Sequence, residues 1–293
     1  KENREVHKFL RAIGFSDITK KDLEMILDEV ITRPEIMKIT KDSEGNEFAE
    51  LSGSFAANAG ITVRGTYQED DSFHMDYYYP YVFGTSITTN EQIDVEKHAE
   101  KESYAGVCDE VNLGVTLIFY IQNVADYLAE TNRHLSKIHY GAMLAGLSTE
   151  GKILCPVVER KKNDVPAIQK NDRHNQLIAQ AREGDEDAIE SLTLEDMDTY
   201  ALLSQRVMKE DIFSIVKSTF MPFGIESDQY TVLGEIIDCV TMENKLTHEK
   251  LYGMKLLCNN IQFDVCINEK DLLGEPAIGR RFRGNVWMQG NLC

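Results

Sequence analysis

The chain lacks the features that would place it in a membrane or outside the cell. It holds 293 residues, and no apolar run approaches the roughly 18 residues of a membrane-spanning helix. The six cysteines form no C-x-x-C pair, their spacing is irregular, and no N-x-[ST] sequon is present. Residues 1–6 are charged and lack the apolar centre of a secretory signal. These absences predict reduced thiols in a soluble, cytoplasmic protein.

Local motifs for metals, nucleotides and catalysis are also missing. His134 and His139 are five residues apart, about 140° around a helix, so they would not share a face. Residues 146–153 follow the phosphate-loop pattern up to its last position, where Ile153 replaces the required serine or threonine. Since Pro156 would interrupt the helix that a phosphate loop opens, we expect a hairpin turn here. The sequence predicts no cofactor and no metal, although a catalytic site built from distant residues stays open.

Negative charge dominates the composition. There are 49 acidic and 31 lysine or arginine residues, which gives a formal net charge of -18. Such a chain repels phosphate backbones and anionic lipid surfaces. Residues 183–198 are crowded with acids but lack the spacing of a calcium loop, so we interpret them as capped, solvated helix starts. The charge disfavours nucleic acid and membranes as partners and weakly favours cationic or neutral ones. We expect a protein partner or a homo-oligomer.

The first half of the chain alternates between helical and strand periodicity. Helices are predicted at 7–13 and 19–30, where Thr19 supplies the N-cap, and again at 122–131. A turn at 42–46 separates two arms of a hairpin. The remaining predicted strands are 61–67, 73–83, 114–120 and a hairpin of 137–145 with 152–158.

The second half begins with a polar segment and returns to period two near its end. Residues 160–172 are the predicted linker, and helices follow from Asn175, one of them starting at Asp185. Four strand-like runs then come close together, which suggests a small barrel or sandwich. These runs are 230–240, 251–258, 261–267 and 281–288.

We therefore predict an α+β fold. An α+β domain with a mostly antiparallel sheet covers residues 1–168. A central helical segment covers 169–220, and a small C-terminal β-barrel or sandwich covers 221–293.

Consecutive tyrosines in the predicted strand 73–83 form one candidate site. Neighbouring residues of a strand point to opposite faces, so Tyr77 and Tyr79 share a face and Tyr78 lies on the other. Either both faces are covered, or one aromatic row is exposed and stacks on a partner. Tyr77 and Tyr79 are the candidate binding residues.

The second candidate site is the cationic, aromatic stretch 279–290, which holds three arginines and the only tryptophan. In a strand, Arg281, Arg283 and Trp287 share one face, and Phe282, Val286 and Met288 form an apolar core face opposite. The arginine face would bind carboxylate or phosphate groups while the indole stacks. In the alternative, the arginines pair internally with some of the many acids.

Long motifs along the chain resemble a known family. They are His7–Ser16, Gly184–Asp196, Phe220–Tyr230 and Gly279–Gly290. Together they resemble an uncharacterised family of bacterial proteins from Firmicutes, defined only as a domain of unknown function. The resemblance covers nearly the whole chain and implies a cytoplasmic protein, but it implies no catalytic residue.

The favoured function is a non-enzymatic role in protein interaction or as a scaffold. It rests on the absence of a catalytic motif and on the two candidate surfaces. One alternative is an enzyme, for example a hydrolase, with its site between the two β-rich parts. Another is a nucleic-acid-binding barrel, which the net charge disfavours.

Overall fold

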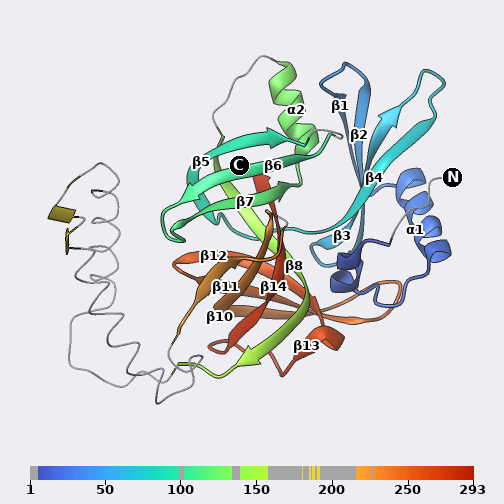
Figure 1. Ribbon diagram of the computed structural model, residues 1–293. Helices are drawn as coiled ribbons and strands as arrows, with labels where there is room; N and C mark the ends of the chain where they lie inside the picture. Colours follow the sequence, from blue (N-terminus) through green and yellow to red (C-terminus); the bar gives the residue numbers. More distant parts are fainter. Residues whose placement is uncertain are drawn as a thin grey trace. The chain divides into compact units, whose positions relative to one another are not determined.

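Internal contacts divide the chain into two compact units. The first unit comprises Lys1–Leu154 and Ser218–Cys293, and the second comprises Cys155–Lys217. Figure 1 shows the computed structural model. It describes residues 6–98, 102–133, 139–157, 216–225 and 227–293, with positions 180, 185, 187, 188, 190 and 191.

Little of the second unit is described. The predicted linker at 160–172 and most of the predicted helical segment at 169–220 lie outside the described residues. Within the described part, the backbone N–H of Ala188 donates to the Asp185 carboxylate at 3.1 Å. This bond is typical of a helix N-cap and agrees with the helix start predicted at Asp185.

The first unit begins with two helical elements and a four-stranded antiparallel sheet. The elements are η1 (Lys8–Ile13), α1 (Lys20–Thr32), β1 (Ile36–Lys41), β2 (Glu47–Ala56), β3 (Ala59–Tyr67) and β4 (Phe73–Val82), and the strand order is β1-β2-β3-β4. The turn predicted at 42–46 is present. Its Asp42 carboxylate accepts the backbone N–H groups of Glu44 and Asn46, and Gly45 has a φ of 94°, so local turn chemistry fixes this hairpin.

Helix α1 starts where the sequence predicts. Thr19 Oγ1 accepts the backbone N–H of Asp22 at 3.2 Å and donates to its carboxylate at 2.6 Å. Leu23, Leu27 and Val30 are buried, and each such side chain stabilises the fold by about 1.5–3 kcal/mol relative to exposure. The helix is therefore held by its cap and by one apolar stripe.

A second, larger sheet contains the other strands. They and the helices between them are β5 (Thr89–Lys97), β6 (Tyr104–Glu110), β7 (Val115–Ile121), α2 (Val124–Asn132), β8 (His139–Leu154), β9 (Thr219–Pro222), β10 (Gln229–Glu243), β11 (Lys250–Cys258), β12 (Ile261–Asn268), η2 (Glu269–Asp271), β13 (Leu272–Leu273) and β14 (Arg281–Leu292).

The strand pairings of this sheet close two rings. One ring runs β10-β11-β12-β8-β14 and back to β10, and the other runs β8-β5-β6-β7-β14 and back to β8. Both rings use the antiparallel pair of β8 and β14, the two long strands that pass between the upper and lower groups of strands in Figure 1. Parallel pairings of β12 with β8 and of β14 with β7 complete the rings.

The hairpin predicted from 137–145 and 152–158 is wrong. Residues 139–154 form one strand, β8, which pairs with β14 from Ala142 to Leu154. A register shift lies between the pairs Ser148–Val286 and Glu150–Asn285, so the predicted turn is a bulge inside the strand. At Gly151 an added Cβ would lie 2.4 Å from the Phe282 ring. Here glycine permits close packing on β14 rather than a turn.

The predicted α+β class is also wrong, because the described part of the chain is mostly β. Within the first unit, that part contains fourteen strands and only two α-helices and two short 3₁₀ helices. The helices expected near 19–30 and 122–131 are present as α1 and α2, but they are short elements beside two extensive sheets. The four C-terminal strands are present too, yet residues 221–293 do not close a ring alone because β8 supplies one wall.

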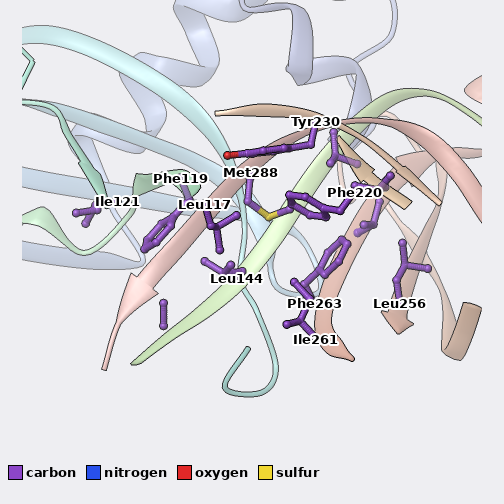
Figure 2. Packing of buried hydrophobic residues seen from close by; sticks show 14 of the residues in the cluster. Leu117, Phe119, Ile121, Leu144, Phe220, Tyr230, Leu256, Ile261, Phe263 and Met288 are labelled. Carbon is purple, nitrogen blue, oxygen red and sulfur yellow. The ribbon is translucent and has the colours of Figure 1, made fainter. Parts of the chain in front are cut away.

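The larger core fills the space enclosed by the strand rings. Phe220, Tyr230, Phe263 and Met288 are among its side chains (Figure 2), and the Phe220 and Tyr230 ring centroids are 4.5 Å apart. Phe282, Val286 and Met288 belong to this core, so the predicted apolar face of 281–288 is confirmed. Trp287 packs in the other core, which also contains residues of η1, α1 and the first sheet.

Candidate functional site

The predicted tyrosines surround a buried arginine. Arg64 on β3 is 0% exposed. Its Nη1 donates to the hydroxyls of Tyr77 at 2.9 Å and Tyr120 at 2.7 Å, and its Nη2 donates to the hydroxyl of Tyr79 at 3.1 Å. The guanidinium carbon lies 4.8 Å from the centroid of the Tyr79 ring and 5.3 Å from that of Tyr120, within cation–π range.

Glu50 on β2 balances the charge of Arg64. Arg64 Nε donates to Glu50 Oε1 at 2.7 Å, and Glu50 Oε2 accepts the backbone N–H of Ala125 at 3.0 Å. Ala125 is in the first turn of α2, where a carboxylate is stabilised by the helix dipole. Arg64 Nη2 also donates to the carbonyls of Ile121 and Gln122. Every nitrogen of the guanidinium therefore has an acceptor, as a buried charge requires.

Burial keeps two tyrosines of this cluster, Tyr79 and Tyr120, protonated. It raises the pKa of Tyr79 and of Tyr120 well above the ordinary value. The hydroxyl of Tyr77 donates onward to the Glu102 carbonyl at 2.7 Å. Since the donors and acceptors satisfy one another, this cluster ties β2, β3, β4, β7 and α2 together.

Trp287 extends the cluster toward the N-terminal residues. Its ring centroid lies 5.4 Å from Tyr120, 5.3 Å from Phe9 and 5.1 Å from His7. Its indole Nε1 donates to Asp228 Oδ2 at 2.7 Å, and the residue is 7% exposed. Thus three of the predicted residues, Tyr77, Tyr79 and Trp287, meet around Tyr120.

Arg281 and Arg283 are placed elsewhere. They pair in register with Leu154 and Lys152, near one end of the β8–β14 ladder, whereas Trp287 pairs with Leu147 near its middle. Arg281 is buried, and Arg283 is half-buried. The sequence pattern did not predict that Trp287 packs with the tyrosines.

Sequence reasoning missed Arg64, Glu50 and Tyr120. A signal was available, since Arg64 is a charge inside the apolar run 61–67, and a buried strand charge needs a partner. Its partners come from β2, β4 and β7, however, and no local pattern links these strands.

His7 predicts a pH-dependent stability. Burial, and next the charge of Lys8, lowers the pKa of His7 to about 4. The unfolded chain, with an ordinary pKa near 6.5, therefore binds more protons between these values. The linked stability is present above about pH 6.5 and is lost as pH falls toward 4, up to about 3 kcal/mol in all. Urea unfolding at pH 7 and pH 5 should differ by up to about 2 kcal/mol from this group.

His7→Asn is the matched control for that prediction. His7 Nδ1 accepts the backbone N–H of Phe9 at 3.3 Å, and asparagine supplies an equivalent cap acceptor without titrating. We expect the pH 7 to pH 5 loss to be smaller in the variant. An identical loss in both proteins would assign it to other groups.

A groove beside helix α1, called the α1 groove below, is a concavity lined by described residues. Its volume is about 420 Å³. Phe15 and Ile26 contribute apolar surface, and Met25 and Leu246 are 55% and 50% exposed. The lining residues are Phe15, Ser16, Asp17, Ile18, Asp22, Met25, Ile26, Glu29, Leu246, Thr247 and Glu249.

The loop between β10 and β11 forms the wall of the α1 groove opposite the helix. Asn244 is 0% exposed, and its Nδ2 donates to the Ile13 carbonyl at 2.7 Å. Thr247 Oγ1 donates to the Gly14 carbonyl at 2.6 Å. Gly14 has a φ of 94°, and a Cβ there would lie 2.6 Å from Asn244 Cβ. Buried polar contacts therefore preform this wall.

Glu249 is held at the same wall. Its carboxylate accepts from Ser16 Oγ at 2.8 Å, Asn268 Nδ2 at 2.6 Å and Lys270 Nζ at 2.6 Å. Burial alone would raise the pKa of Glu249, but these hydrogen bonds lower it below its ordinary value. The Ser16–Glu249 pair is thus a poor nucleophile and base, since an ionised, low-pKa carboxylate is a weak general base at neutral pH.

The described residues give little support for metal binding or for a reactive thiol. Among them, no group of three or more His, Cys, Asp or Glu side chains could hold a metal ion. All six cysteines are free. Burial raises the pKa of Cys108, Cys258 and Cys266 to about 12, which keeps these three thiols protonated and unreactive.

Comparisons with known proteins give one match. Residues 10–290 match the family model described as a domain of unknown function, E. rectale gene description (DUF3881). No curated protein and no solved structure matches the chain. In the part of the chain that the structure describes, no helix has the length and apolar character needed to cross a membrane.

Proposed function

We propose, from the geometry of the site, that the protein is a non-catalytic protein-interaction module. The chain belongs to the DUF3881 family, which is described as a domain of unknown function. In this proposal the α1 groove receives a short segment of a partner protein. The main support for this proposal is a preformed concavity of about 420 Å³ that combines exposed apolar side chains with a polar rim. Such a volume lies within the range of ligand sites and holds a few side chains.

Three further observations support this role over catalysis. The buried contacts of Asn244 and Thr247 preorganise the groove wall, which reduces the entropy lost on binding. Met25 and Leu246 expose apolar surface that a partner would bury. The hydrogen-bonded Glu249 carboxylate holds Ser16 in place without activating it.

We also propose a cytoplasmic location. Six free cysteines support it, because reduced thiols are typical of reducing compartments. The net charge of -18 supports a protein partner over nucleic acid.

A peptide selection tests the proposed function. Peptides are selected from a random dodecapeptide phage library on the immobilised full chain, and their affinities are measured for Met25→Ser/Leu246→Ser. Both side chains are about half exposed, so the double variant should keep its stability. We expect at least a tenfold loss of affinity, since two buried apolar contacts disappear.

Met37→Ser/Ile39→Ser is the matched control. These β1 side chains are 50% and 49% exposed but do not line the groove. They should leave affinity unchanged. If no selected peptide depends on Met25 and Leu246, the α1 groove is not a docking site and the proposed function is wrong.

A further inference from the structure

We infer that the segment docking in the α1 groove carries two basic side chains, about 10 Å apart, on either side of one apolar side chain. This inference rests on the proposed function and names the chemistry of the partner. It follows from the charge of the groove, from the spacing of its acidic residues and from the extended form of a short peptide.

The charge of the groove is strongly one-sided. Four carboxylates line it, from Asp17, Asp22, Glu29 and Glu249, and none of its lining residues is basic. Lys270, just outside, lies 3.7 Å from Asp17 and 2.6 Å from Glu249, so one lysine serves two carboxylates. Asp22 and Glu29 are exposed on α1 at the rim. The groove is thus complementary to a cationic ligand.

The spacing comes from helix α1. Its groove-lining stripe is Asp22, Met25, Ile26 and Glu29, the i, i+3, i+4, i+7 pattern of one helix face. The two carboxylates therefore flank the apolar pair, and seven residues at 1.5 Å each separate them by about 10 Å. Lysine and arginine suit such a rim because their aliphatic stems pack on apolar surface while their charged ends reach acids.

The form of the ligand follows from the length of the peptides. A dodecapeptide is too short to be a stable helix in water, and its unfolded chain samples the extended polyproline II form. In the polyproline II form, three residues per turn at about 3.1 Å each place residues i and i+3 on the same side, about 9 Å apart. The two basic residues therefore occupy positions i and i+3. The ligand is therefore a peptide with basic residues at i and i+3 and an apolar residue between them.

The test uses the groove-dependent dodecapeptides from the phage selection. We expect lysine or arginine at i and i+3 around an apolar residue in these peptides. Glu29→Lys should weaken their binding about five- to tenfold, because an attraction at the rim becomes a repulsion. Replacing the peptide lysines and arginines by glutamate should abolish binding to the original chain and restore part of it with the Glu29→Lys variant.

Glu24→Lys is the matched control. It makes the same charge change on the same helix, but Glu24 does not line the groove. It should change affinity less than twofold. Circular dichroism melts check that both variants are folded.

Three outcomes would overturn the inference. They are groove-dependent peptides without the two basic residues, equal effects of Glu24→Lys and Glu29→Lys, and spermidine binding the chain as tightly as the peptides do. In each case, peptides that still require Met25 and Leu246 would leave the proposed function standing. Loss of that requirement would remove both.

Discussion

Replacing Arg64 with methionine is expected to lower the free energy of unfolding by about 3–5 kcal/mol. The substitution leaves the Glu50 carboxylate, which is 5% exposed, without its cation. It also removes the donor to the hydroxyls of Tyr77, Tyr79 and Tyr120. Urea unfolding followed by circular dichroism measures the loss.

Two further variants show whether the ion pair causes this loss. Arg64→Lys keeps the charge but supplies fewer, less directional donors, so it should lie between the wild type and Arg64→Met. Arg64→Met/Glu50→Leu removes both charges and should be more stable than Arg64→Met alone, since no buried charge is left unpaired. If the separate losses of Arg64→Met and of Glu50→Leu simply added in the double variant, Arg64 and Glu50 would not be coupled.

The parts of the fold that depend on local chemistry were predictable. Thr19 caps α1, and Asp42 with Gly45 makes the first hairpin turn, because each uses groups only a few residues apart. The inward face of β14 was predictable as well, since side chains alternate in any strand.

The closure of the strand rings was not predictable. It requires β8 to run unbroken through the stretch 146–151, where glycines and a serine suggested a turn. It also requires parallel pairing of β12 with β8, and the two strands are more than a hundred residues apart in sequence. Register between distant strands depends on packing on both faces, which a single sequence does not display.

The candidate site residues were also only partly predictable, because their contacts join strands that are distant in sequence. Tyr77, Tyr79 and Trp287 stand out as unusual aromatics, but their meeting depends on Arg64 and Tyr120, which lie on strands that no local pattern links to them. The α1 groove joins α1 to Leu246 and Glu249, more than two hundred residues away. Acidic and apolar residues on α1 were visible, but the opposite wall was not.

Trp287→Ala is expected to cost about 3–5 kcal/mol, the range for deleting a buried tryptophan. The indole contacts His7, Phe9 and Tyr120, so its removal opens a cavity between η1 and the strand rings. It also leaves the Asp228 carboxylate without the indole N–H that it accepts at 2.7 Å.

Trp287→Phe separates packing from hydrogen bonding. Phenylalanine keeps an aromatic ring for Phe9 and Tyr120 but lacks a donor for Asp228, so we expect a smaller loss of about 1–2 kcal/mol. Because Trp287 is the only tryptophan, variants are compared by circular dichroism rather than by fluorescence.

Hydrogen exchange locates the effect of Trp287→Ala. Since the indole packs against Phe9 of η1, amides of η1 should lose protection before those of β8 and β14, which hold their own ladder. An unchanged melting temperature would mean that Trp287 contributes no packing energy and would return it to the candidate binding residues. A loss of the expected size assigns Trp287 to fixing η1, and with it Gly14 and Ser16 at the edge of the α1 groove, against the strand rings.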